Sequence, residues 1–141
     1  MRMIMTRDTS SQRDARQGLV YRWAKNTFGD GAIQPTERAT RFLEEAIELA
    51  QAQGIPIEEV KKLVDYVYAK PPGDIAQEVG GCGVTLLAFC AAVGLYADEE
   101  ERNEVRRVLA KDPSHFQMRQ NIKAEAGIAI KVDVDEAPDN T

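Results

Sequence analysis

The sequence predicts an all-α protein: a four-helix-bundle-like core with additional C-terminal helices, assembled as an oligomer. Apolar residues recur at helical spacing between positions 12 and 127, and hardly any segment alternates as a strand does. Proline, glycine and capping residues divide the same stretch into six segments. The 141 residues, 43% of them hydrophobic and 29% charged, suit one folded domain rather than a disordered chain.

The ends of the first three helices are marked clearly. The first ends at Gly-Asp-Gly, residues 29–31, and the second begins at Pro35, because proline suits a first helical turn. Gly54 is a C-terminal cap for the second, and two prolines at 71 and 72 close the third, which is amphipathic. These helices are expected at about residues 12–28, 35–54 and 55–70.

The fourth helix is the most apolar segment of the chain. Asp74, followed three residues later by Gln77, resembles a capping box that starts it, and Gly94 ends it. It is apolar nearly all round, so it belongs in the middle of a bundle or at a subunit interface, and we read it as a core helix rather than a membrane span. Two further helices are expected at about 98–112 and 114–127, the last capped by Ser114.

Net charge, cysteine content and the two ends of the chain indicate which partners and which cellular setting to expect. The net charge is −5 and no dense Lys/Arg block occurs, so no nucleic-acid polymer is expected as a partner. Cys82 and Cys90 are too far apart on one helix for a disulfide, which fits a reducing, cytoplasmic setting without a membrane. Residues 1–11 lack the apolar stretch of a signal peptide and are expected to be flexible, as is the acidic tail 128–141.

One acidic helix face stands out in FLEEAIELA, residues 42–50. At about 100° per residue, Glu45 and Glu48 lie roughly 60° apart, with Glu44 about 40° on the other side of Glu48. Periodicity alone favours a solvated helix surface. Glu78, beside the apolar fourth helix, is a separate carboxylate that a bundle could bring opposite, and carboxylates that converge between helices form the oxygen cage that Mg²⁺ prefers.

These residues resemble a known family, the MazG-like all-α nucleoside triphosphate pyrophosphohydrolases. The family motif is E-E-x-x-E followed by E-x-x-D on a later helix. EEAIE supplies Glu44, Glu45 and Glu48, EVGG supplies Glu78, and VYRWAKNTFG, residues 20–29, extends the resemblance over most of residues 12–126.

The resemblance implies a MazG-type core in residues 12–127 and hydrolysis of a (d)NTP to a (d)NMP and pyrophosphate. Mg²⁺, or Mn²⁺ in its place, would be held by Glu45, Glu48 and Glu78, with Glu44 and Glu48 as catalytic residues. Arg119 and Lys123, one turn apart, would meet the outer phosphates, and Trp23 would stack on the base; Arg41 is a further substrate-binding candidate. For each of these four, a solvated surface or a place in the core is the alternative.

The sequence departs from the motif at one position. The second motif's aspartate falls at Gly81, which has no side chain. Asp74, one turn before Glu78, could supply a fourth carboxylate, although its capping context favours a cap. A second function therefore stays open, that of a catalytically impaired helical binding or assembly module. The all-round apolar fourth helix predicts a homodimer or homotetramer in either case.

Overall fold

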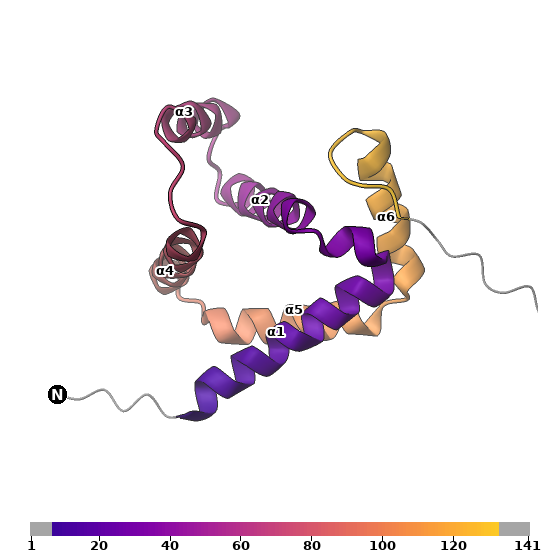
Figure 1. Ribbon diagram of the computed structural model, residues 1–141. Helices are drawn as coiled ribbons and strands as arrows, with labels where there is room; N and C mark the ends of the chain where they lie inside the picture. Colours follow the sequence, from indigo (N-terminus) through magenta and orange to yellow (C-terminus); the bar gives the residue numbers. More distant parts are fainter. Residues whose placement is uncertain (1–6, 133–141) are drawn as a thin grey trace, which may run out of the picture. The chain divides into compact units, whose positions relative to one another are not determined.

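The computed structural model describes residues 7–132, and within that range the chain is all-helical, as predicted (Figure 1). No strand occurs among these residues. The elements are α1 (Arg7–Phe28), the 3-10 helix η1 (Asp30–Ile33), α2 (Pro35–Ala52), α3 (Ile57–Tyr68), α4 (Ile75–Val93), α5 (Ala97–Ala110) and α6 (Pro113–Glu125).

Three helices end in the same way, at glycines that the sequence marks as terminators. Gly54, Gly94 and Gly127 have φ values of +87°, +75° and +78°, a region that residues with a side chain rarely adopt. The next backbone N–H then donates to a carbonyl five positions back. These bonds are Ile55 N to Ala50 O at 3.0 Å, Leu95 N to Cys90 O at 2.9 Å and Ile128 N to Lys123 O at 3.0 Å.

The caps at the helix starts confirm one prediction and correct another. Asp74 caps α4, since its Oδ2 accepts the Gln77 N–H at 3.0 Å. At α6, however, the cap is Asp112 and not Ser114, because Pro113 already occupies the first turn. Asp112 Oδ1 accepts the Ser114 N–H at 2.8 Å, and hydrogen bonds from the side chain and backbone of Ser114 lower the pKa of Asp112.

The chain divides into two compact units whose boundaries fall inside α2 and α5. The first unit comprises α1, η1, the start of α2 as far as Phe42, and the chain from Leu109 onward. The second unit is Leu43–Val108, which holds the rest of α2, α3, α4 and most of α5.

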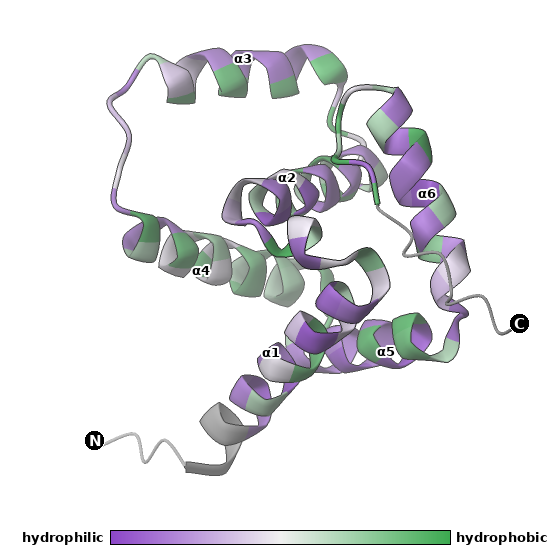
Figure 2. Ribbon diagram, turned by 45° about the vertical axis from the view of Figure 1, so that its right-hand side comes forward, coloured by the Kyte–Doolittle hydropathy of each residue, from purple (hydrophilic) through white to green (hydrophobic). Residues whose placement is uncertain are grey.

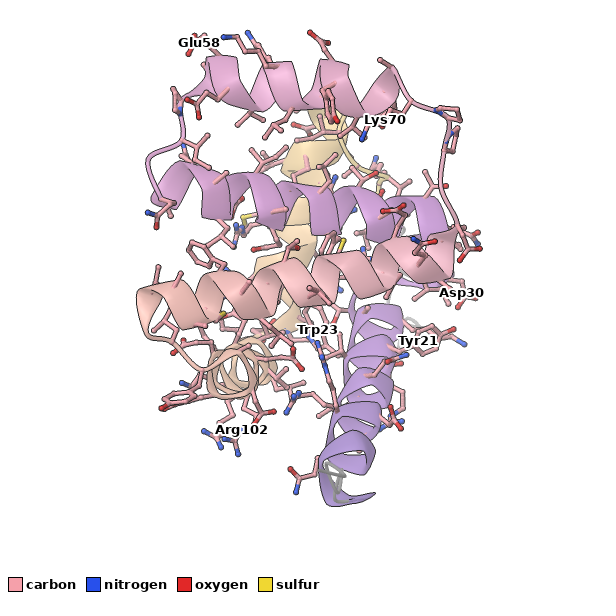
Figure 3. All side chains as sticks on the ribbon, turned by 90° about the vertical axis from the view of Figure 1, so that its left-hand side faces the viewer. Tyr21, Trp23, Asp30, Glu58, Lys70 and Arg102 are labelled. Carbon is pink, nitrogen blue, oxygen red and sulfur yellow. The ribbon has the colours of Figure 1, made fainter. Side chains whose placement is uncertain are left out.

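The first unit has a small aromatic core. Ala24, Phe28, Ala32 and Val132 are buried, and Trp23, Ile33 and Phe116 pack against them. Trp23 meets Phe28 and Phe116 edge to face, with ring centroids 5.4 and 5.2 Å apart. Trp23 and Tyr21 leave different sides of α1, and Tyr21 is 51% exposed (Figure 3).

A side-chain hydrogen bond also connects α6 to the end of α1. Gln117 of α6 donates to the Thr27 carbonyl at 2.8 Å.

A buried carboxylate anchors the segment that follows α6. Glu37, only 6% exposed, accepts Gln120 Nε2 at 2.8 Å through Oε1 and the Ile130 N–H at 3.3 Å through Oε2. Arg41 Nε lies 3.4 Å from Glu37 Oε1, and Arg41 also donates to the Ile128 carbonyl. Residues 128–132, which the sequence placed in a flexible tail, are therefore bound to the first unit up to the buried Val132; residues 133–141 lie outside the described range.

The second unit buries few of its apolar side chains. Its only buried residue is Cys90, and its large apolar side chains are widely exposed, from Ile55 at 37% to Ile75 at 84%. In α3 the hydrophobic residues line one side and the hydrophilic residues the other, whereas α4 is hydrophobic or neutral along most of its length (Figure 2). By length and composition, α4 is also the one helix among residues 7–132 that could cross a membrane. Exposed apolar surface of this extent is typical of surfaces that contact another protein or a membrane.

Candidate functional site

The three glutamates of α2 lie on the second unit, as the EEAIE pattern predicts for one helix. Glu45 and Glu48 are exposed and Glu44 is half-buried. Among the described residues, none gives Glu48 a hydrogen bond or an ion pair, so its carboxylate is available to a cation. Glu44 and Glu45 both interact with other groups of the chain.

Arg107 of α5 is a cation of the second unit whose charge interacts with Glu45 of this acidic helix. Its Nε donates to Glu104 Oε2 at 2.8 Å, and its Nη2 pairs with Glu104 Oε1. The hydrogen bonds and charge of Glu104, with a smaller contribution from the charge of Glu45, raise the pKa of Arg107. Sequence reasoning missed Arg107, because helical spacing relates residues on one helix and says nothing about which residue of α5 comes near α2.

Glu78 occupies the first turn of α4 and is exposed. Its backbone N–H donates to the Asp74 carbonyl at 2.9 Å, and its side chain folds back toward Gly73. A Glu78 carboxylate buried together with a core helix would require a compensating cation. In the single chain, water and the positive end of the α4 dipole already stabilise this charge, so burial gives no reason for a cation.

The donor chemistry of these side chains fits Mg²⁺, which prefers carboxylate oxygens. Glu48 and Glu78 come from two helices, and no partner among the described residues occupies either carboxylate. Within residues 7–132, however, no three His, Cys, Asp or Glu side chains gather around one point. Glu45, Glu48 and Glu78 therefore form no three-carboxylate group among the described residues, and Asp74, which caps α4, does not complete one.

The four substrate-binding candidates all belong to the first unit. Trp23 is part of the aromatic core, Arg41 binds Glu37 and the Ile128 carbonyl, Arg119 is exposed, and Lys123 is half-buried. A neighbour that the sequence did not single out as a site residue is Arg38, which lies over the Phe28 ring, 5.7 Å from its centroid. Burial lowers the pKa of Arg38, and its buried Nε and Nη2 meet no acceptor within the described range.

Comparison of the chain with protein-family models, with curated proteins and with solved structures finds no match.

Proposed function

We propose that the protein is a Mg²⁺-dependent nucleoside triphosphate pyrophosphohydrolase of the MazG-like type. The observation that carries the proposal is the pair Glu48 and Glu78. These motif carboxylates stand on two different helices of the second unit, exposed and without a partner among the described residues. A carboxylate that stabilises its own fold would be paired or hydrogen-bonded, so these two are free to serve a ligand.

The residues would share the reaction as follows. Glu45, Glu48 and Glu78 would hold Mg²⁺, which would supply positive charge at the nucleotide phosphates. Glu44 accepts a proton from the water that attacks phosphorus, and the bond to the bridging oxygen breaks so that pyrophosphate leaves. Arg107 supplies positive charge beside this acidic face. The products are a nucleoside monophosphate and pyrophosphate.

We also propose that the protein works as a homodimer or homotetramer in which α4 is covered by a second copy. Val79, Val84 and Leu87 of α4 are 66%, 67% and 56% exposed in the single chain. A second copy presents the same apolar helix, so a two-fold contact would cover both at once. Assembly would also bring carboxylates of different chains together, whereas no three of them gather within residues 7–132 of one chain.

The test is pyrophosphate release from a panel of ribo- and deoxyribonucleoside triphosphates, with Mg²⁺, with Mn²⁺ and with neither. We expect metal-dependent release that falls about a hundredfold or more in Glu48→Gln, because the amide keeps the size of the side chain and loses its charge. Glu99→Gln, the same change at an exposed position of α5, should leave the rate unchanged. A folded protein that releases no pyrophosphate from any triphosphate would refute the enzyme.

The absence of a side chain at Gly81 favours a second candidate, an impaired helical binding or assembly module. Apart from the neighbouring residues and the backbone of α4 itself, no heavy atom lies within 4 Å of a Cβ placed at Gly81, so the chain has room for the motif's aspartate. We expect Gly81→Asp to raise metal-dependent release about tenfold, since it adds a carboxylate one turn from Glu78. Gly81→Asn, which matches its size without the charge, should not; equal rates for the two would show that the added charge does nothing. A native protein that gains activity only through Gly81→Asp would be the impaired module.

A further inference from the structure

The guanidinium group of Arg38, on α2, is a charge whose buried donors lack an acceptor. Its Nε and Nη2 atoms are shielded from water, and no acceptor within residues 7–132 forms a hydrogen bond with them. The group lies over the Phe28 ring, 5.7 Å from its centroid, and the face of a ring attracts a cation without replacing a hydrogen-bond acceptor. Because a buried charge without an acceptor is costly, the missing acceptor is expected to come from elsewhere in the chain.

The neighbouring carboxylate, Glu37, does not fill this role. Its Oε1 accepts Gln120 Nε2 at 2.8 Å and lies 3.4 Å from Arg41 Nε, and its Oε2 accepts the Ile130 N–H at 3.3 Å. The charge of Glu37 raises the pKa of Arg38, but burial has the larger effect and lowers that pKa overall. Glu37 therefore compensates the burial of Arg38 only in part.

Two segments of the chain lie outside the described range, and carboxylate side chains occur in one of them. Residues 1–6 hold none, whereas residues 133–141 hold four, three of which follow closely on Val132: Asp133, Asp135 and Glu136. Val132 is buried in the same cluster as Phe28, over whose ring Arg38 lies. Since four residues of extended chain span up to about 14 Å, residues 133–136 begin within reach of the Arg38 guanidinium.

We propose that the acidic segment 133–136 binds the first unit, with one of its carboxylates accepting hydrogen bonds from the Arg38 guanidinium. The chain that leads to this segment is already held against α2, where Arg41 donates to the Ile128 carbonyl and Glu37 accepts the Ile130 N–H. A pair with Arg38 extends this series of contacts and places opposite charges together where water screens them little. The inference is independent of the proposed function.

Urea unfolding of the full chain, followed by the fluorescence of Trp23, gives the sign of the effect. Arg38→Met keeps an apolar stem beside the Phe28 ring and removes the charge. We expect the midpoint of unfolding to fall by about 1 M, because the carboxylate loses its partner. A guanidinium buried without a partner would give the opposite result, a midpoint that stays or rises. Arg119→Met, the same change at an exposed position of α6, is the matched control and should leave the midpoint unchanged.

A double-mutant cycle identifies the acidic segment as the partner. The triple variant Asp133→Asn, Asp135→Asn and Glu136→Gln should lower the midpoint about as much as Arg38→Met does, and the two together should lower it little further. Additive effects, or a triple variant as stable as the native protein, overturn the inference. Where the cycle shows coupling, the three single changes show which carboxylate is the partner.

Proton exchange at Arg38 tests the contact directly. By nuclear magnetic resonance, the Nε proton of Arg38 should exchange with water at least about tenfold faster in the triple variant than in the native protein, because it loses its acceptor. An equal exchange rate in the two proteins would mean that the acceptor is not in residues 133–136, whatever the urea midpoints show.

Discussion

Replacement of Glu37 by leucine is expected to lower the free energy of unfolding of the first unit by about 3 kcal/mol. Leucine fills the site and accepts no hydrogen bond, so the Gln120 amide, the Ile130 N–H and the Arg41 guanidinium lose their shared acceptor inside the protein. Arg41, whose side chain is 14% exposed, carries the largest penalty because it loses the opposite charge of Glu37 at a site with little contact to water.

Urea unfolding followed by tryptophan fluorescence measures this effect selectively. Trp23 is the only tryptophan of the chain and packs in the core of the first unit, so its emission reports on that unit. Glu37→Gln keeps one acceptor oxygen and should lose about half as much stability. Glu48→Gln, the same chemical change at an exposed site of α2, should stay within about 0.5 kcal/mol of the native protein.

Hydrogen exchange adds a result that a general loss of stability would not give. Without Glu37, the Ile130 amide loses its acceptor, so amides of 128–132 should exchange faster than those of α1. If Glu37→Leu unfolds at the same urea concentration as Glu48→Gln, the buried carboxylate does not hold this segment.

The helices were predictable because their signals are local. Proline at 35, the capping sequence at Asp74 and glycines at 54, 94 and 127 each act within one turn, and the structure places helix ends at all of them. The Asp112 cap was missed for a local reason as well. Ser114 and Asp112 both suit a cap, and only the fixed φ of Pro113 at the first helical position decides between them.

The candidate site was predictable only in part. Spacing placed Glu44, Glu45 and Glu48 together on α2, since the 3.6-residue period relates neighbours on one helix. The proximity of Arg107 to Glu45, the buried Glu37 and its tie to Ile130 join residues far apart in the sequence, and no periodicity encodes such pairs. Glu37 lies in the first turn of α2, where an exposed glutamate commonly interacts with the helix dipole. Its position in the sequence therefore does not indicate that it is buried.

Conversion of Leu87 to lysine is expected to turn the proposed assembly into monomers. Leu87 is 56% exposed in the single chain and lies on the apolar helix that a second copy would cover. In a covered position, lysine would bring an unpaired charge into an apolar contact and lose the burial of the leucine side chain, which together cost about 3 kcal/mol or more. The dissociation constant of the assembly should therefore rise at least about a hundredfold.

Sedimentation velocity at micromolar concentration distinguishes the occupants of the α4 surface. Met118→Lys places the same side chain at an apolar position of α6 that is 65% exposed, and it should sediment as the native protein does. A native protein that is already monomeric would remove the second copy as the cover of α4. A native protein that stays in solution only with detergent would instead favour a lipid environment for this helix, whose length and composition also permit a membrane span. The same experiment bears on the proposed metal site, because no three carboxylates gather within residues 7–132, and an assembly would bring carboxylates of different chains together.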